Sequence, residues 1–406
     1  MNKPQIRFKG FEDEWRQSTF GDVCSIYDGV HQTPKYTTSG VMFVSVENIK
    51  TLRSNKFISF EAFKSDYNVV PERGDILMTR IGDIGTANVV LSNEPLAYYV
   101  SLALLKNPSL DSFFFKTAIA SPDTIAELWK RTLHIAFPKK INKNEIAFVG
   151  IKHPSNLEQQ QIGNYFRQLE EMIAEMEREV NRLEKMKQAS LQKMFPRPGA
   201  NTPEIRFAGY EGEWRKCKLC ELLSQRIEHL KISKDEPLLA FSYSEGVIDP
   251  EDKKSNKRDF LMTDKFNKVF SRTEVNDIIY NPANVIHGAI HRNTLKTGVV
   301  SPIYKIFKCY ENISPKYMGF RLRTSTFIAD IFKYIEGTVI KLRTLSPESF
   351  LNMEIEIPNS LQEQEAIGDY FINLDALISA KRQKLTKLRN IKQACLDKMF
   401  VNTSEL

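Results

Sequence analysis

The sequence repeats itself after half its length, and this repeat limits the possible folds more than any other feature. Residues 4–16 read PQIRFKGFEDEWR and residues 203–215 read PEIRFAGYEGEWR, identical at nine of 13 positions. A second pair of similar segments, 154–195 and 358–400, closes the two halves with MKQASLQKMF and IKQACLDKMF, identical at seven of ten positions. Repeats at this spacing indicate a duplicated structural unit.

The stretches between these repeats, 17–150 and 216–355, share few identities, but a common skeleton can be aligned. GDILMT (74–79) aligns with NDIIYN (276–281), and YVSLALLK (99–106) aligns with VVSPIYKIFK (299–308). Each pair predicts a short buried strand followed by a turn. PRPGANTP (196–203) predicts a linker. We therefore expect a variable domain at 1–150, a helical segment at 151–198, a second variable domain at 199–355 and a second helical segment at 356–406.

Both closing segments predict long helices. Ser155-x-x-Glu158 is a capping-box pattern, and Asn359 with Gln362 repeats it. Apolar residues then alternate at steps of four and three, the heptad seam of a coiled coil. The predicted seam comprises Ile162, Phe166, Leu169, Ile173, Met176, Val180, Leu183, Ile367, Phe371, Leu374, Ile378, Leu385 and Leu388.

The duplication predicts an α+β fold: two duplicated domains of mixed helix and strand, separated by two long antiparallel coiled-coil helices with pseudo-twofold symmetry. The alternative is an ordinary helical hairpin inside a globular domain. Lys381, Lys187 and Lys392 interrupt the seam, which means either local looseness or pairing with acidic residues of the other helix. Trp15 and Trp214, in the repeated EWR, are expected to anchor each domain to the helices, since large apolar rings are usually buried.

The composition is that of a soluble protein with a mild positive excess. The chain has 406 residues and a net charge of +7. The helical segments carry −1 and +2, so +6 lies elsewhere and favours a polyanionic partner held by the variable domains. Five irregularly spaced cysteines, with no secretory signal and no apolar run near 18 residues, lead us to expect a cytoplasmic protein that does not enter a membrane.

We expect no catalytic centre, metal site or cofactor in this chain. Asn281-Pro-Ala-Asn284 lacks the second proline and the aromatic ring of an adenine methyltransferase loop, and it predicts a turn after a strand. Cys217 and Cys220 have no second CxxC pair, which a zinc site would need. His287 and His291 have helical ligand spacing, but Gly288 between them favours a turn. No phosphate-binding GxxxxGK[ST] loop occurs.

The order of variable domain, P-x2-LEQQ…KMF helix, variable domain and P-x2-LQEQ…KMF helix resembles the specificity (S) subunit of type I restriction–modification enzymes. YDGVHQTPKYTTSGVMFVSVENI (27–49) and GDILMTRIGDIG (74–85) resemble patterns of the same family. The second domain lacks the TPKY pattern.

The resemblance implies that each variable region is a target recognition domain that reads one half of a split double-stranded DNA target. It also implies that the helices act as a ruler and dock two methylation (M) subunits, and that restriction (R) subunits join that core. The S subunit is non-catalytic, and its partners use S-adenosylmethionine, ATP and Mg²⁺. The alternative is a scaffold whose coiled coil joins two protein-binding domains without DNA, and the location of the positive charge favours DNA over it.

Candidate DNA contacts are side chains that can bind base edges or phosphates and that lie in loops of the variable domains. Each could instead be a solvated surface charge. In the first domain they are His31, Gln32, Lys35 and Tyr36 in a turn-rich segment, and Arg80 after a predicted strand. Arg80 leads into Gly82, where the backbone itself could approach DNA closely. In the second domain they are Gln225, Arg226, Lys253, Lys254, Lys257, Arg258, His287, His291, Arg292 and Lys296.

Overall fold

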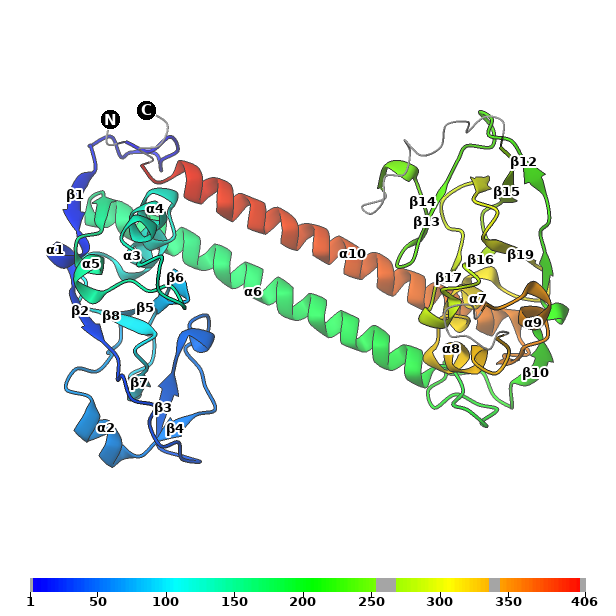
Figure 1. Cartoon of the computed structure of the whole chain (residues 1–406), viewed down its shortest axis with the longest axis horizontal. Helices are drawn as coiled ribbons and strands as arrows, with labels where there is room; N and C mark the ends of the chain where they lie inside the picture. The colour runs from blue at the N-terminus through cyan, green and yellow to red at the C-terminus, as the bar shows by residue number, and fades with distance from the viewer. Residues whose placement is uncertain (1–2, 253–267, 336–343, 402–406) are drawn as a thin grey trace. The chain divides into compact units, whose positions relative to one another are not determined.

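The computed structural model describes residues 3–252, 268–335 and 344–401 and divides into two compact units. Unit 1 contains residues 1–178 and 383–406, and unit 2 contains residues 179–382. Two 38-residue helices, α6 (Asn156–Lys193) and α10 (Leu361–Lys398), are each divided between the units (Figure 1). The predictions of an α+β fold and of two long helices are confirmed.

Unit 1 is built on a four-stranded antiparallel sheet in the order β2 (Ser25–Asp28), β8 (Leu102–Lys106), β5 (Ile76–Ile81), β6 (Asp83–Val89). A three-stranded sheet follows in the order β4 (Phe57–Ile58), β3 (Val41–Val44), β7 (Leu96–Tyr98), and β1 (Arg16–Thr19) pairs with β9 (Gly150–His153). The short helices are α1 (Phe20–Val23), α2 (Phe60–Asp66), α3 (Ser112–Ile119), α4 (Pro122–Lys130) and α5 (Lys143–Ala147).

The two central strands of the main sheet of unit 1 are buried on both faces, which explains the apolar runs of β5 and β8. Ile76 and Met78 of β5 belong to a core shared with α3, whereas Leu77 between them belongs to a core shared with β3. Successive residues of a strand point to opposite faces, so a strand between two apolar layers needs apolar residues at every position.

Unit 2 repeats this plan with a sheet in the order β11 (Leu223–Gln225), β19 (Lys305–Cys309), β16 (Ile278–Tyr280), β17 (Ile290–Arg292). Its other strands are β12 (His229–Leu230), β15 (Phe270–Thr273) and β18 (Gly298–Val300), the hairpin β13 (Ala240–Ser242) with β14 (Gly246–Ile248), and the pair β10 (Arg215–Lys218) with β20 (Glu354–Ile357). Its short helices are α7 (Pro315–Arg321), α8 (Ser325–Ile331) and α9 (Pro347–Leu351). β16 pairs with β19 as β5 pairs with β8, which confirms the alignment of the two variable regions.

The repeated sequence motifs make the same buried ion pair in each unit. Two of the three guanidinium nitrogens of Arg7, Nε and Nη2, lie 2.7 and 2.8 Å from the Glu158 carboxylate oxygens, and Arg206 contacts Glu363 at 2.6 and 2.8 Å. Both glutamates are almost fully buried. A bidentate pair satisfies both carboxylate oxygens of a buried glutamate, which would otherwise be costly to desolvate. The IRF and LEQQ/LQEQ motifs are therefore linked because one supplies the cation and the other the anion.

This pairing corrects the capping-box prediction. Glu158 binds Arg7 and does not reach back to Ser155 at the start of α6. In the second helix the cap is one residue later than expected, since the Ser360 hydroxyl, rather than the Asn359 side chain, accepts from the backbone N–H of Glu363 at 3.3 Å. The pattern located the start of α6 correctly and that of α10 within one residue, but at α6 it assigned the Glu158 carboxylate the wrong partner.

A glycine in the second turn of each long helix allows a short helix to approach closely. A Cβ at Gly163 would lie 2.5 Å from Oδ1 of Asp111 and 2.7 Å from the backbone nitrogen of Phe114, in the first turn of α3. A Cβ at Gly368 would lie 2.6 Å from Cβ of Lys316, in the first turn of α7. Real Cβ contacts are longer than this, so only glycine permits these two packings.

The residues that close each long helix complete the core of a unit. In unit 1 the ring of Phe400, just after α10, lies 5.9 Å from Trp15 and 5.8 Å from Phe114. In unit 2 the ring of Phe195, just after α6, lies 6.4 Å from Trp214. Both tryptophans are nearly fully buried. The prediction that they anchor each variable domain to the helices is confirmed.

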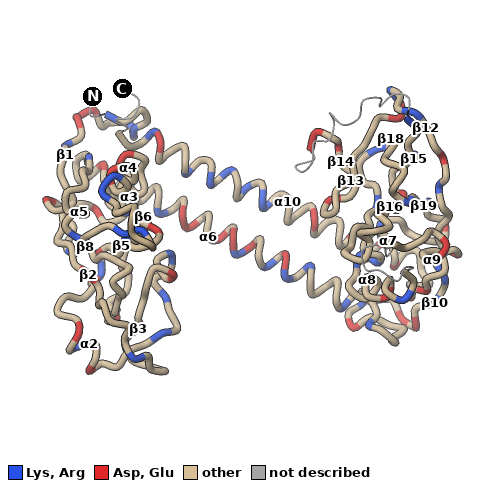
Figure 2. The backbone as a smooth tube through the Cα atoms, viewed as in Figure 1, with Lys and Arg blue, Asp and Glu red and all other residues tan. Residues whose placement is uncertain are grey.

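Within each unit, parts of α6 and α10 pack antiparallel along the predicted seam. The seam residues are buried except for Ile173 and Leu183, which are half-buried. The interrupting lysines are ion-paired across the helices: Lys392 with Glu170 at 2.6 Å in unit 1, and in unit 2 Lys381 with Glu179 at 2.8 Å and Lys187 with Asp375 at 2.5 Å. In Figure 2 several acidic residues are visible along the middle of α6 and several basic residues along the middle of α10. Of the two alternatives, pairing with acidic residues is confirmed.

Candidate nucleic-acid interface

In unit 1 the two predicted DNA-binding loops lie beside one another. His31, Gln32 and Lys35 line a cavity of about 730 Å³, and His31 with Arg80 lines an adjoining cavity of about 430 Å³. Both cavities are also lined by Lys143 at the start of α5, and the second by Lys140. The structure therefore brings residues 27–36 and 80–82 together with a basic segment, 139–144, that sequence reasoning missed.

The turn-rich segment 27–36 is held in place at its single glycine, Gly29. A Cβ at Gly29 would lie 2.5 Å from the backbone oxygen of Tyr98, so this passage of the chain accepts no side chain. The following residue, Val30, donates its N–H to Tyr98 and accepts from the N–H of Val100 at 3.0 Å. Beyond this anchor His31, Gln32 and Lys35 are exposed to solvent. They are placed where a ligand in the cavity can contact them.

Tyr36 is the fourth predicted residue of this segment, and one side of its ring packs against other residues of unit 1. It packs edge-on against Phe43 with 5.6 Å between ring centres, and Nζ of Lys56 lies 5.6 Å from its centre. Its side chain is 43% exposed, so the remaining ring surface is accessible.

Arg80 and Gly82 hold the two loops of the candidate interface together through hydrogen bonds within unit 1. Arg80 is buried, donates from Nε to the backbone oxygen of Ile141 at 3.0 Å and pairs with Asp28. We therefore remove Arg80 from the residues that could reach a base edge. Gly82 adopts a left-handed φ of +80° in the turn between β5 and β6, which favours glycine. Its N–H donates to the backbone oxygen of Lys139 at 2.8 Å.

In unit 2 the arginine of the predicted pair Gln225-Arg226 is also used internally. Arg226 contacts Asp277 at 2.8 Å, Glu274 at 2.7 Å and Glu228 at 2.8 Å. Burial by itself would lower the pKa of Arg226, but the hydrogen bond to Asp277 and the neighbouring carboxylates raise the pKa overall. Arg226 is thus removed from the base-reading candidates, whereas Gln225 is exposed.

The segment 287–296 contains both internal and exposed residues. His291 is buried with Nε2 2.9 Å from the backbone oxygen of Tyr243, and burial lowers its pKa to about 4, with the charge of Arg323 acting in the same direction. His291 is neutral at pH 7 and donates to that oxygen, so it is not available to contact a base. His287 is exposed and lines a cavity of about 600 Å³ that Arg323 also lines.

The other basic residues of this segment are bonded at the surface. Arg292 donates to the side-chain oxygen of Asn276 at 2.7 Å, and Lys296 pairs with Asp249 at 2.6 Å. An exposed ion pair such as Lys296–Asp249 is weak and can exchange for a phosphate, whereas Arg292 is half-buried. Lys253, Lys254, Lys257 and Arg258, the densest basic loop of the sequence, lie outside the described residues.

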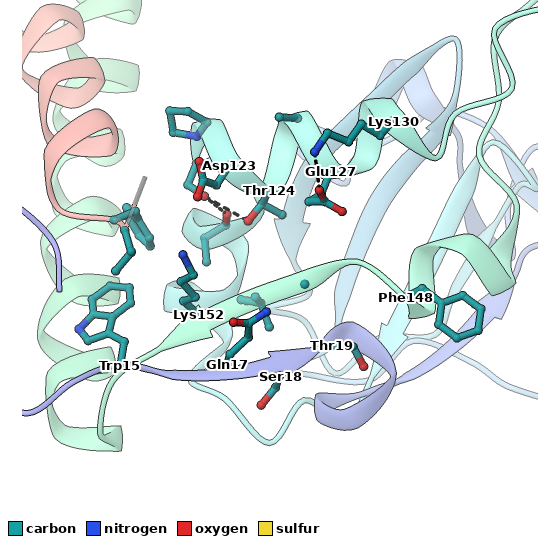
Figure 3. A pocket seen from close by; sticks show the side chains of 18 of the residues that line it. Trp15, Gln17, Ser18, Thr19, Asp123, Thr124, Glu127, Lys130, Phe148 and Lys152 are labelled. Atoms are coloured by element: carbon teal, nitrogen blue, oxygen red, sulfur yellow. Dashed lines mark hydrogen bonds and ion pairs between the residues drawn. The ribbon is translucent and has the colours of Figure 1, made fainter. Parts of the chain in front are cut away.

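A further cavity of unit 1, about 1000 Å³, lies between β1, α4 and β9 (Figure 3). Asp22, Asp123 and Glu127 line it together with Lys130 and Lys152. Its charges are mixed, and Glu127 is already paired with Lys130 at 2.9 Å. None of the predicted site residues line it.

The motifs that sequence analysis considered for chemistry have structural surroundings. Asn281 follows β16 in a turn and its side-chain oxygen accepts from the N–H of Ala283 at 3.0 Å, which confirms the predicted turn. Burial raises the pKa of Cys217 to about 11, so its thiol stays protonated, whereas Cys220 is exposed. Within the described ranges no three His, Cys, Asp or Glu side chains cluster as metal ligands would. In the same ranges no helix combines the length and apolarity that crossing a bilayer requires.

Comparison with solved structures assigns the fold. The S subunit of the type I restriction–modification system of M. genitalium aligns over 99% of this chain and 100% of its own length, with a TM-score of 0.64 and 14% identity. This chain has the S-subunit fold. The alignment includes both units and both long helices, so the resemblance seen in the repeats is confirmed at the level of the fold.

Two further structures align at full length with lower scores. One comes from work on assembly and conformational transition of the type I R-M system (TM-score 0.46, 15% identity, 95% of this chain and 97% of that one). The other is the HsdS subunit from Thermoanaerobacter tengcongensis (TM-score 0.42, 15% identity, 98% and 99%). No protein-family model matches the sequence, and no curated protein matches it.

Proposed function

We propose that this chain is the specificity subunit of a type I restriction–modification enzyme and has no catalytic role of its own. In this proposal each unit reads one half of a split DNA target, while α6 and α10 set the unread spacer between the half-sites. The observation that carries the proposal is the alignment of the whole chain with an S subunit at a TM-score of 0.64. A scaffold for two unrelated proteins would not need the same reading unit twice.

The distribution of charge supports a DNA ligand. In unit 1, Lys35, Lys140 and Lys143 are exposed around the adjoining cavities, and no carboxylate within the described ranges pairs with them. Lysines without a carboxylate partner bind phosphates at no cost in lost ion pairs, and each phosphate contact releases a counterion from the DNA.

The long helices carry equivalent exposed apolar side chains, which supports docking of two copies of one partner. Met172 and Met186 of α6 are 48% and 40% exposed, and Leu377 and Ile391, 205 positions later on α10, are 43% and 37% exposed. Each unit contains one residue from each helix. Apolar residues repeated at the surface favour burial in an interface, and we assign this interface to two M subunits, with R subunits joining the resulting core. S-adenosylmethionine, ATP and Mg²⁺ would then be bound by those partners.

The function is tested by co-expressing the chain with the M subunit encoded beside it in a host free of adenine methylation, and sequencing the modified adenines. We expect one split motif with a constant spacer. An assembled complex that binds S-adenosylmethionine but modifies no DNA would favour the protein scaffold instead.

The docking surface is tested by Met172→Asp combined with Leu377→Asp, which places charge at equivalent points of the two helices. We expect the M subunits to stop co-purifying with the variant. Phe60→Asp, at a 58% exposed residue of α2, is the matched control and should retain them. Retention by the double variant would show that the M subunits bind elsewhere.

A further inference from the structure

The loop from Leu133 to Lys140, between α4 and α5, is a closed element fixed to the candidate interface. At its base the N–H of Leu133 donates to the backbone oxygen of Lys140 at 2.8 Å. The loop is joined to the β5–β6 turn because the N–H of Ile141 donates to Arg80 at 3.0 Å and that of Gly82 donates to Lys139 at 2.8 Å. Any ligand in the cavities lined by Arg80 and Lys140 therefore lies next to this loop.

The tip of the loop presents two large apolar side chains to solvent. Ile135 and Phe137 are 99% and 103% exposed, so neither packs against the protein. Single exposed apolar residues are common on protein surfaces, but two fully exposed ones on one short, closed loop indicate a surface that is covered in a complex.

The side chains behind the tip hold it in one shape. The Trp129 ring, at the end of α4, lies 4.8 Å from the His134 ring, and Nζ of Lys139 lies 4.4 Å from the centre of that indole. The Nε2 atom of His134 is 3.0 Å from the Trp129 backbone oxygen. A loop ordered before binding loses less conformational entropy when its tip is buried.

The charges around the tip identify the partner. Lys139, Lys140 and Lys143 have no carboxylate partner in the described ranges, whereas the nearby Glu127 and Glu145 both contact Arg131. An apolar wedge flanked by cations without carboxylate partners fits a nucleic-acid duplex, where the cations bind phosphates and the wedge enters between base pairs.

We propose that loop 133–140 inserts Ile135 and Phe137 between base pairs of the DNA bound to unit 1, with Lys139, Lys140 and Lys143 holding the flanking phosphates. The inference rests on the proposed function and adds to it a DNA distortion at the first half-site. The sequence at the distorted step would then contribute to specificity without direct base readout, because base-pair steps differ in the energy needed to open them. The proposal concerns unit 1 alone, since residues 336–343 between α8 and α9 of unit 2 lie outside the described residues.

The test uses the complete complex of this chain with its M subunits and duplexes carrying the methylation-defined target. 2-Aminopurine is placed singly at each position of the first half-site, avoiding the methylated adenine, and its fluorescence rises where stacking is lost. We expect a rise at one step with the wild type, loss of that rise with Phe137→Ala, and an affinity about ten-fold lower, the scale of one stacking contact. Phe60→Ala is the matched control for an exposed phenylalanine and should change neither quantity. Lys140→Gln should reduce the salt dependence of binding by about one phosphate contact.

Three results would overturn the inference. The first is a wild-type complex that binds the target without any fluorescence rise in the first half-site. The second is unchanged affinity and fluorescence in Phe137→Ala. The third is loss of M subunits from Phe137→Ala, which would assign the tip to a protein contact. A wild-type complex that binds no DNA at all is a different result, because it refutes the proposed function itself.

Discussion

Replacing Phe400 with alanine should destabilise the part of the chain that lies farthest from it in sequence. Phe400 is buried in the core of unit 1, with its ring 5.9 Å from Trp15, 5.8 Å from Phe114 and 6.0 Å from Phe166. Deleting such a ring removes its buried apolar surface and leaves a cavity, which together cost about 3–5 kcal/mol. The loss falls on unit 1, since all three contacting rings belong to it.

Native-state hydrogen exchange followed by mass spectrometry measures where this loss occurs. At about 1.4 kcal/mol per factor of ten, the most protected amides of β1, α3 and β5 should exchange roughly 100- to 4000-fold faster in Phe400→Ala, while those of β16 and α7 keep their protection. Phe195→Ala is the symmetric control and should reverse the pattern, because Phe195 packs on Trp214 and Phe371 of unit 2. Faster exchange in unit 2, or equally in both units, would refute the reasoning that each helix end belongs to one core.

Three further outcomes are expected. Unit 2 should lose about 3 kcal/mol of stability as the pH falls from about 6.5 to 4, because His291 takes up a proton near pH 6.5 when unfolded but only near pH 4 when folded. Urea titrations at a series of pH values should show this fall in the free energy of unfolding. The same titrations on His291→Gln should show a smaller fall. Gly163→Ala should lower the free energy of unfolding by about 1–3 kcal/mol in urea titrations, because its Cβ would meet Oδ1 of Asp111 at 2.5 Å. Gly150→Ala should cost less, since a Cβ at Gly150 has open space around it. Equal costs for the two variants would contradict the close-packing argument. Trp15→Ala should loosen unit 1 but leave the second half of the methylated motif unchanged; altered base preference at normal stability would count against an anchoring role.

The repeats in the sequence were sufficient to predict the architecture, because each weak sequence pattern occurs in both halves of the chain. The apolar stripe interrupted by Lys381 left two interpretations open in the sequence, and the ion pair with Glu179 of the other helix decides between them in the structure. GDILMT and NDIIYN could be aligned because both strands are buried on both faces and therefore tolerate few polar residues. These constraints act along a short stretch of chain, where sequence patterns are informative.

The candidate interface was less predictable because residue type does not reveal the partner of a charge. Arg80, Arg226 and His291 are residue types that read bases, yet each is bonded to a distant backbone or carboxylate group of its own unit. Conversely, Phe137 was missed because an apolar residue is expected inside the protein, and no local pattern distinguishes a fully exposed one. A clue was present in the cluster of basic residues after it, at 139, 140 and 143.

The way the helix ends complete the two cores sets an order on synthesis. Unit 1 includes residues 383–406, whereas all of unit 2 lies between residues 179 and 382. During translation unit 2 is therefore complete before unit 1, although the variable domain of unit 2 is made second. The first variable domain must wait, with the surface around Trp15 uncovered, until Phe400 and Val401 have left the ribosome. An N-terminal domain ordinarily folds first as the chain emerges. Here the completed fold of unit 1 depends on residues that are made after the whole of unit 2.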